Sequence, residues 1–306
     1  MQSIKIGVLK EGKIPVDRRV PLTPTQAKEL EDLFPEIKVL VQKSPVRCFD
    51  DSLYSDENIE VVDNILDCDI LLGVKEVPII ELMDNKTYLF FSHTTKEQPY
   101  NRELLREILR KNIRLIDYEK LTDKKGNRLI AFGRYAGIVG AYNGIWAYAK
   151  RFKLFNLRRA YTCRNLDDLK TEFDKVELPP IRIVITGSGR AGKGAAEVLF
   201  GMGVRKVGPE EFINEEFDTP VYTQLSSADY NTRTDGKEFD RRDFHEDPEQ
   251  YQSDFLKFAH KADILIASAY WNPHAPRLFS QDDVLNSDFR IKVIADITCD
   301  IEGSIP

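Results

Sequence analysis

The sequence predicts an α/β fold with two Rossmann-like domains, each built on a parallel sheet, and an inter-domain cleft. A length of 306 residues suits two domains of about 150 residues each. Short apolar runs alternate with helical patterns, which is typical of parallel sheets with right-handed crossovers. A Gly-rich turn at residues 187–192 lies between a β-branched strand and an Ala-rich helix. We expect the first domain to cover residues 1–136 and the second residues 137–306.

The composition excludes several classes of protein. Apolar residues make up 42% and charged residues 31%, which is ordinary for a globular chain. The net charge of −6, without a basic run, argues against nucleic acid as a partner. No stretch reaches about 18 consecutive apolar residues, so we expect no membrane-spanning helix, and no signal-peptide core is present. The four cysteines are widely spaced, which argues against disulfides and zinc and favours the reducing cytoplasm.

Each element of the first domain has its own signal. A helix is predicted to begin after Thr23, because Thr23 suits the N-cap, Pro24 suits the first helical position and Gln26 completes a capping box. A second helix is expected over residues 101–111. Alternating or unbroken apolar runs predict strands over residues 4–9, 37–41, 69–74, 88–91 and 113–116.

The second domain is predicted to follow a long helix over residues 137–153. The clearest boundary signal is Leu178-Pro179-Pro180. Residues 208–251 are polar and acidic without clear periodicity, so we expect either a functional insertion or a mobile segment. The remaining patterns predict strands over residues 181–185, 262–267 and 291–297 and a helix over residues 195–200.

The Gly-rich turn reads Gly187-Ser188-Gly189-Arg190-Ala191-Gly192 and fits a dinucleotide-binding site. Gly187 permits the tight turn, Gly189 lets the backbone approach a pyrophosphate, and Gly192 allows close packing of the helix on the strand. The phosphates would lie at the positive end of the helix. Two alternatives stay open: an ordinary turn, and a nucleoside-triphosphate loop in which Gly194 replaces the magnesium-binding Ser or Thr.

The choice of nucleotide depends on the end of the second strand of this domain. An acidic residue at the end of that strand binds the ribose hydroxyls of NAD. We assign the strand to Arg205-Lys206-Val207, which is followed by Gly208-Pro209, with Glu210 slightly late. The absence of a carboxylate and the nearby basic side chains favour NADP(H) over NAD(H).

Polar side chains follow several strands of the first domain. Lys75, His93 and Glu119 each come shortly after a predicted strand. The loop after the first strand carries Lys10, Glu11, Lys13, Arg18 and Arg19. Ligands bind beyond the carboxyl ends of parallel strands, so these residues form a candidate acid/base and carboxylate-binding set, although each alone is commonly a solvated surface residue. No role is assigned to His245, His260 and His274.

These motifs resemble a known family. Lys10-Glu11, residues 19–24 and residues 73–78 are similar to the N-terminal signature of the alanine dehydrogenase, transhydrogenase and saccharopine dehydrogenase superfamily. Narrower segments resemble lysine-forming saccharopine dehydrogenase, especially the lysine–ketoglutarate reductase domain of the bifunctional lysine-degrading enzyme. These segments are residues 90–96, 114–120, 131–137, 270–273, 275–278 and 295–297. The resemblance covers nearly the whole chain.

The resemblance implies a reversible oxidoreductase reaction. The ε-amine of lysine and the carbonyl of 2-oxoglutarate form an imine, which NAD(P)H reduces to saccharopine. Lys75 and His93 would be the acid/base pair. The substrate-binding residues would be Arg19, Lys96, Glu119 and Arg128. Residues 187–192, Tyr270 and Asp296 would bind the cofactor, and the chemistry needs no metal.

Two alternatives and one departure accompany this interpretation. Alanine dehydrogenase is similar, but it lacks the Arg134-Tyr135 context and the long acidic insertion. A catalytically silent nucleotide- or amino-acid-binding protein is the other alternative. Family members continue past the strand that contains Asp296, whereas this chain ends at Pro306, so we expect the segment that returns to the first domain to be absent. An oligomer is compatible with the sequence.

Overall fold

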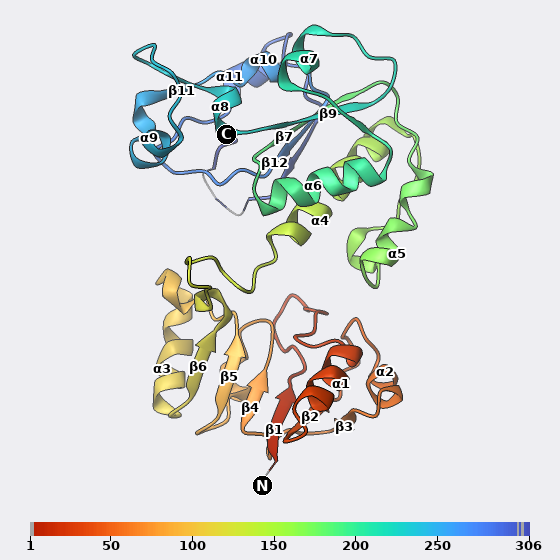
Figure 1. Cartoon of the computed structure of the whole chain (residues 1–306), viewed down its shortest axis with the longest axis vertical. Coiled ribbons are helices and arrows are strands. Elements are labelled where there is room, and N and C mark those ends of the chain that lie inside the picture. The colour runs from red at the N-terminus through yellow and green to blue at the C-terminus, as the bar shows by residue number, and fades with distance from the viewer. Residues whose placement is uncertain (1–2, 299, 301–302) are drawn as a thin grey trace. The chain divides into compact units, whose positions relative to one another are not determined.

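The structure is a computed structural model that describes residues 3–298, 300 and 303–306, without the side chain of Lys96. The chain forms two compact units, which we call unit 1 (Met1–Ala131) and unit 2 (Phe132–Pro306) (Figure 1). Both contain a parallel sheet with helices, so the predicted α/β class is confirmed. Within the described residues, no helix is both long and apolar enough to cross a lipid bilayer.

Unit 1 is a parallel sheet with the strand order β3-β2-β1-β4-β5-β6. The strands are β1 (Ile4–Val8), β2 (Ile37–Gln42), β3 (Glu60–Val62), β4 (Ile70–Leu72), β5 (Thr87–Phe90) and β6 (Arg114–Asp117). The helices are α1 (Pro24–Leu33), α2 (Asp51–Asp56) and α3 (Arg102–Arg110), with 3-10 turns η1 (Ile79–Glu81), η2 (Thr94–Lys96), η3 (Pro99–Asn101) and η4 (Tyr118–Lys120). The predicted capping box of α1 is confirmed, because Thr23 and Gln26 exchange hydrogen bonds.

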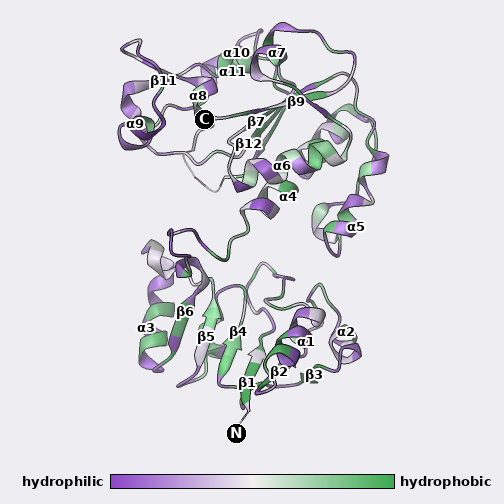
Figure 2. Ribbon diagram, viewed as in Figure 1, coloured by the Kyte–Doolittle hydropathy of each residue, from purple (hydrophilic) through white to green (hydrophobic). Residues whose placement is uncertain are grey.

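Two apolar clusters lie in unit 1, and Figure 2 shows the strands that supply them in green. One cluster joins β1 and β2 to α1 and α2, and the other joins β4 and β5 to α3. The first is centred on Val8, Ala27, Val39, Val41 and Tyr54, and the second on Leu71, Tyr88, Phe90, Leu104 and Ile108. The sheet is thus supported by apolar packing along its length.

Unit 2 is a parallel sheet with the strand order β13-β12-β7-β9-β8 and a separate antiparallel pair, β10 and β11. The strands are β7 (Arg182–Thr186), β8 (Arg205–Lys206), β9 (Val221–Leu225), β10 (Asn231–Arg233), β11 (Tyr251–Ser253), β12 (Ile264–Ala267) and β13 (Val293–Asp296). The helices are α4 (Gly133–Phe152), α5 (Leu166–Lys170), α6 (Arg190–Gly201), α7 (Pro209–Asn214), α8 (Ser227–Tyr230), α9 (Arg241–Glu246), α10 (Leu256–Ala259) and α11 (Gln281–Leu285). Further 3-10 turns are η5 (Ala160–Thr162), η6 (Phe173–Lys175) and η7 (Pro248–Gln250).

The central strand β7 is buried along its whole length. Ile183 and Ile185 face a cluster formed with α4 and α6, while Val184 faces a cluster formed with α7 and α10. Alternate residues of one strand therefore contact two separate cores, as expected for a parallel sheet covered on both faces.

Three differences from the predicted elements are informative. The long helix begins at Gly133 rather than Gly137, and α6 begins directly after Gly189 rather than near Ala195. Residues 208–251, which lacked periodicity, contain α7, α8, β10, α9 and a full sheet strand, β9. Val221-Tyr222-Thr223 consists of residue types that favour a strand, but the polar residues around this run made the strand hard to recognise.

Candidate functional site

The strand order of unit 1 creates a switch point between β1 and β4. The chain adds β2 and β3 on one side of β1 and then β4, β5 and β6 on the other. Ligands of open parallel sheets bind at such a point, beyond the carboxyl ends of the strands. The loops that follow β1, β4, β5 and β6 at these ends carry Glu11, Arg19, Lys75, His93 and Glu119.

Glu11 attaches the loop after β1 to the turn after β4. Its two carboxylate oxygens accept hydrogen bonds from the backbone N–H groups of Val74, at 2.7 Å, and Lys75, at 2.9 Å. Burial raises the pKa of the Glu11 carboxyl, although these two hydrogen bonds oppose the shift. The position of the Lys75 backbone is thus set by a side chain more than sixty residues away in the sequence.

Glu76 connects three loops at the same edge of the sheet. One oxygen lies 2.7 Å from Nδ1 of His93, and the other accepts from Nζ of Lys13 at 2.5 Å. Burial acts to raise the pKa of the Glu76 carboxyl, but the hydrogen bonds from Lys13 and His93 outweigh burial and lower it. Glu76 therefore stays ionised and orients the His93 ring.

The backbone of His93 is held in an uncommon conformation. His93 has φ 54° and ψ 12°, in the left-handed region that non-glycine residues rarely adopt. Asn101 donates to its carbonyl at 3.2 Å, and both the N–H and the hydroxyl of Ser92 donate to buried Asp117. Asp117 also accepts from the backbone N–H of Glu119 at 2.8 Å. Conformations of this kind persist where surrounding contacts enforce them, commonly at functional sites.

Arg19 is paired with Asp17, a residue that was not predicted as part of the site. The Arg19 guanidinium donates to both carboxylate oxygens of Asp17, at 3.0 Å and 2.5 Å. Burial opposes ionisation of Asp17, but the hydrogen bonds from Arg19 and the charge of Lys75 lower its pKa. Asp17 is therefore an anion within electrostatic range of two predicted site residues. The one feature of the sequence that could have indicated Asp17 is its position two residues before Arg19.

Glu119 and Arg128 contact each other directly. Nη2 of Arg128 lies 2.9 Å from a carboxylate oxygen of Glu119. The Glu119 side chain is buried, and that of Arg128 is half exposed. The side chain of Lys96, which was also predicted to bind substrate, lies outside the described residues.

The Gly-rich turn of unit 2 shows why each glycine is required. Gly187 has φ 95°, and a Cβ there would lie 2.9 Å from the backbone of Ala269. A Cβ on Gly192 would lie 2.0 Å from the carbonyl oxygen of Gly187. Apart from the chain neighbours of Gly189, no atom of the described residues lies within 4 Å of its Cβ position, so this N-cap of α6 is open to a ligand. The exposed Ser188 and Arg190 flank it.

The structure gives a packing reason for the glycine at position 194, where a nucleoside-triphosphate loop would have Ser or Thr. That motif needs Ser or Thr at position 194, but a Cβ on Gly194 would lie 2.0 Å from the carbonyl oxygen of Arg134 in α4. A Cβ on Gly137 of α4 would likewise collide with α6, because it would lie 1.8 Å from the carbonyl oxygen of Ala191. The two helices thus approach backbone to backbone, and the glycine at 194 is a packing requirement.

The strand predicted over residues 205–207 is present as β8, but it does not lie next to β7. On this side of β7 the neighbouring strand is β9, paired from Val221 to Leu225, and β8 lies beyond β9 at the sheet edge. The chain passes β8 before it returns to β9, and sequence order does not reveal this return. The residue to examine is therefore Ser226, whose N–H and hydroxyl donate to Asp229 at 2.6 Å and 2.8 Å. Because Gly208-Pro209 follows β8 at the sheet edge, these residues give no support to NADP(H) over NAD(H).

The other predicted cofactor residues lie in loops of unit 2. Tyr270 is 85% exposed in the loop after β12. Asp296 is the last residue of β13 and accepts from the N–H and hydroxyl of Thr298. Among the described residues, no three His, Cys, Asp or Glu side chains gather as a metal site would require.

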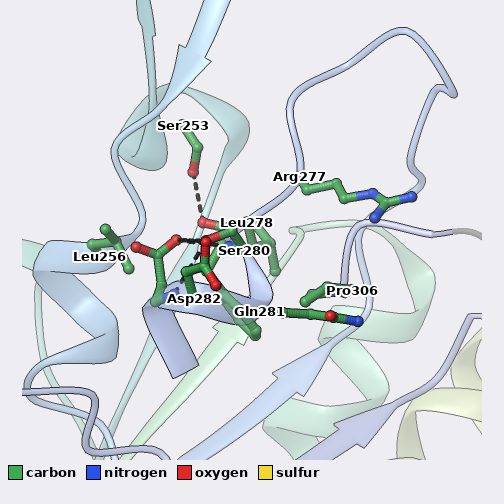
Figure 3. A pocket seen from close by; sticks show the side chains of 10 residues that line it. Ser253, Leu256, Arg277, Leu278, Ser280, Gln281, Asp282 and Pro306 are labelled. Atoms are coloured by element: carbon green, nitrogen blue, oxygen red, sulfur yellow. Dashed lines mark hydrogen bonds between the residues drawn. The ribbon is translucent and has the colours of Figure 1, made fainter. Parts of the chain in front are cut away.

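A separate pocket of unit 2 lies at the start of α11 (Figure 3). The Ser280 hydroxyl accepts a hydrogen bond from the backbone N–H of Asp283 and so caps α11. The Ser253 hydroxyl donates to the Leu278 carbonyl at 2.8 Å. These polar groups bond to one another, and we assign no chemistry to this pocket.

Comparison with known proteins agrees with the motifs. Residues 7–139 match the family described as alanine dehydrogenase/PNT, N-terminal domain. The N-terminal part of the chain is therefore similar to this family. Over most of its length the chain is also similar to the proteins that the sequence motifs predicted. Alpha-aminoadipic semialdehyde synthase of Mus musculus, a mitochondrial protein, is 32% identical over 94% of this chain and 35% of its own length.

Further relatives support the same assignment. The Arabidopsis thaliana synthase is 30% identical over 98% of this chain and 32% of its own length. Saccharopine dehydrogenase [NAD(+), L-lysine-forming] of Yarrowia lipolytica is 29% identical over 74% of this chain and 65% of its own length. The chain thus spans about a third of the length of the synthases.

Solved structures share the fold. An L-alanine dehydrogenase superposes with a TM-score of 0.63 at 18% identity, covering 99% of this chain and 76% of that one. Transhydrogenase from Sinorhizobium meliloti gives 0.56 at 14% identity, covering 92% and 74%. At these identities the likeness concerns the Rossmann-like fold alone.

Proposed function

We propose that this chain is an oxidoreductase that interconverts saccharopine with lysine, 2-oxoglutarate and a reduced nicotinamide nucleotide. The observation that carries the proposal is the connected set of side chains at the edge of the unit 1 sheet. Glu11 holds the backbone of Lys75, and Glu76 holds the ring of His93. The similarity to saccharopine dehydrogenases over most of the chain supports the substrate class.

Lys75 and His93 act as the acid/base pair in this proposal. Imine formation requires a proton for the carbonyl oxygen that leaves as water, and the new secondary amine exchanges a proton as well. A neutral His93 that donates Nδ1–H to Glu76 keeps Nε2 as its proton acceptor. Glu76 is thus a positioning residue, because it acts through His93.

The charged residues around this pair bind the substrates. Both substrates carry carboxylates, which a guanidinium binds through its planar fork. Arg19 and Arg128 supply such groups, with Lys96 as a further cation. Each arginine is already paired with a carboxylate, Asp17 or Glu119. Substrate carboxylates would compete for the arginines, and substrate ammonium groups would take the place of the cations on these two acids.

Unit 2 holds the nucleotide in this proposal. The nucleotide supplies the hydride, and the open backbone at Gly189 with the start of α6 accepts its pyrophosphate. Ser226 directly follows β9, so no carboxylate stands where NAD-binding sites place one. This favours NADP(H) over NAD(H). The Yarrowia lipolytica relative is named for NAD(+), so the assay must include both nucleotides. A cytoplasmic location stays a prediction.

The test is oxidation of NADPH and NADH by the purified chain. One reaction contains lysine and 2-oxoglutarate, and a parallel one contains ammonia and pyruvate. We expect consumption with lysine and 2-oxoglutarate only. Consumption with ammonia and pyruvate instead would favour the alanine dehydrogenase alternative and reject the substrate assignment.

The catalytic assignment is tested with Lys75→Met. Removal of a general acid/base should lower turnover by about a hundred- to ten-thousandfold, with unchanged nucleotide affinity. Lys124→Met, at an exposed loop position, is the control and should keep full turnover. Equal turnover in Lys75→Met and the control would reject the role of Lys75, and absence of turnover in the unmodified chain would favour a silent binding protein.

A further inference from the structure

Asp117, the last residue of β6, carries a buried carboxylate that the proposed reaction does not use. The residue is only 9% exposed. Within the part of the chain that the structure describes, its hydrogen-bond donors are two backbone N–H groups and one hydroxyl, and none of them is a cation. Burial of a carboxylate without a paired cation is costly, so the role of Asp117 has to be sought in the groups that it holds.

These donors belong to two different loops. One carboxylate oxygen accepts from the N–H of Ser92 at 3.3 Å and from the Ser92 hydroxyl, and Ser92 directly precedes His93. The other oxygen accepts from the N–H of Glu119 at 2.8 Å. The loops leave neighbouring parallel strands, β5 and β6, in which Phe90 pairs with Asp117 (Figure 1). One carboxylate therefore joins the loop that carries His93 to the loop that carries Glu119.

Two further contacts strengthen this connection. The rings of Phe91 and Tyr118, one from each loop, meet edge to face with their centroids 5.3 Å apart. Both residues are buried. The Ser92 hydroxyl also accepts from the N–H of Thr94 at 3.2 Å. The carboxylate is thus linked, through Ser92, to the residues on both sides of His93.

We propose that Asp117 is a positioning residue that sets the spacing between His93 and Glu119, and so between the proton-transfer group and the bound substrate. The inference rests on the proposed function, in which His93 moves a proton and Glu119 binds a substrate ammonium group. Asp117 itself touches no substrate and acts through the two loops. A misplacement of reacting groups by about 1 Å can lower a rate about a hundredfold, so release of these loops slows proton transfer.

The test is the steady-state reaction of the full chain with lysine, 2-oxoglutarate and whichever of NADPH and NADH is oxidised faster. Asp117→Ala removes the acceptor of both loops. We expect kcat to fall between about tenfold and about a hundredfold, because His93 is no longer held at the right distance. The KM for lysine should rise about fivefold, because Glu119 is released as well. The KM for the nucleotide should not change.

Ser92→Ala separates the effects of the two loops. It removes only the hydroxyl that donates to Asp117 on the His93 side. We therefore expect kcat to fall about tenfold with an unchanged KM for lysine. The double variant should have the kcat of Asp117→Ala alone, since both changes break the same contact. If the two single effects on kcat multiply in the double variant, the residues act independently and the positioning role is overturned.

Asp263→Ala is the matched control for the loss of a buried carboxylate. Asp263, 7% exposed and directly before β12, accepts from the N–H of Arg182 at 2.9 Å and from Arg290 at 3.0 Å. Asp263→Ala should lower the melting temperature and leave kcat and both KM values unchanged. A loss of turnover equal to that of Asp117→Ala would show that destabilisation alone explains the result and would overturn the positioning role.

The remaining outcomes separate this role from the wider proposal. Full kcat in both Asp117→Ala and Ser92→Ala overturns the positioning role and leaves the proposed activity intact. If Asp117→Ala does not fold, Ser92→Ala decides: a lowered kcat with an unchanged KM supports the role, and full kcat overturns it. Absence of turnover in the unmodified chain with either nucleotide overturns the proposed function, and the positioning role with it.

Discussion

The two units build their sites in opposite ways. In unit 1, carboxylates reach across the sheet edge, and Glu11 and Glu76 each take two hydrogen bonds from other loops or residues. In unit 2, the turn is shaped by missing side chains, since a Cβ on Gly192 or Gly194 would collide with backbone. The first kind of site depends on long-range pairing, and the second depends on close approach of backbone to backbone.

This difference predicts different consequences of mutation. A substitution at Gly192 or Gly194 should first damage folding, because the atoms in the way are backbone atoms that cannot turn aside. A substitution in the carboxylate-built site should first damage activity, because the sheet beneath it has its own apolar cores.

Gly194→Ala should have the largest effect. The new Cβ would lie 2.0 Å from the carbonyl oxygen of Arg134, so α4 and α6 must separate. We expect a loss of about 3 kcal/mol in the free energy of unfolding, measured by urea titration, despite the higher helix propensity of Ala. A stability equal to that of the unmodified chain would show that the two helices are not in backbone contact.

Glu76→Gln should lower turnover with little effect on folding. Gln cannot balance the charge of Lys13 and holds the His93 ring less strongly than a carboxylate. We expect a decrease of about tenfold in kcat at neutral pH, with unchanged nucleotide affinity. Glu81→Gln, an exposed residue of the same loop, should match the unmodified chain. If both variants keep full turnover, Glu76 has no positioning role.

Gly189→Ala should weaken nucleotide binding and spare the fold. No atom lies near the Cβ position, so the free energy of unfolding should change by less than about 1 kcal/mol, a typical cost at an N-cap. The methyl group would occupy the space where a pyrophosphate approaches, so NADPH affinity should fall about tenfold. Unchanged affinity would argue against this position as the phosphate site.

Glu172→Gln should have the smallest effect, and only on stability. Glu172 of unit 2 resembles the carboxylates of the unit 1 site, because it is buried and accepts from Arg158 and Lys175, at 2.8 Å and 2.7 Å. Burial opposes ionisation, but these hydrogen bonds lower the pKa of Glu172 from 4.5 to about 2. The folded carboxylate is therefore stabilising above pH 4.5, and this stabilisation is lost as the pH falls toward 2.

The measurement is urea unfolding of Glu172→Gln and the unmodified chain at pH 7 and pH 3. The difference in stability should be about 1 kcal/mol at pH 7, since the exposed cations are partly screened, and smaller at pH 3. An identical difference at both values would show that the carboxylate charge does not contribute.

The fold and the Gly-rich turn could be predicted from the sequence because their signals lie within short segments. Strand patterns, the Thr23 capping box and the Gly187–Gly192 spacing are local, and local geometry constrains local residue types. The roles of Asp17 and Glu76 could not be predicted, because the residues around a carboxylate in the sequence do not reveal which other side chains it will contact. The position of β9 was missed since order along the chain differs from order in the sheet.

The order β7-β9-β8 also has a consequence for how this protein can diversify. β9 and the segments from α8 to β11 form one continuous stretch, from Val221 to Ser253. A single exchange of that stretch between related genes can therefore replace the end of β9 and the segments that follow it together. The glycines at the contact between α4 and α6, Gly137 and Gly194, lie outside it and can stay constant while that stretch changes.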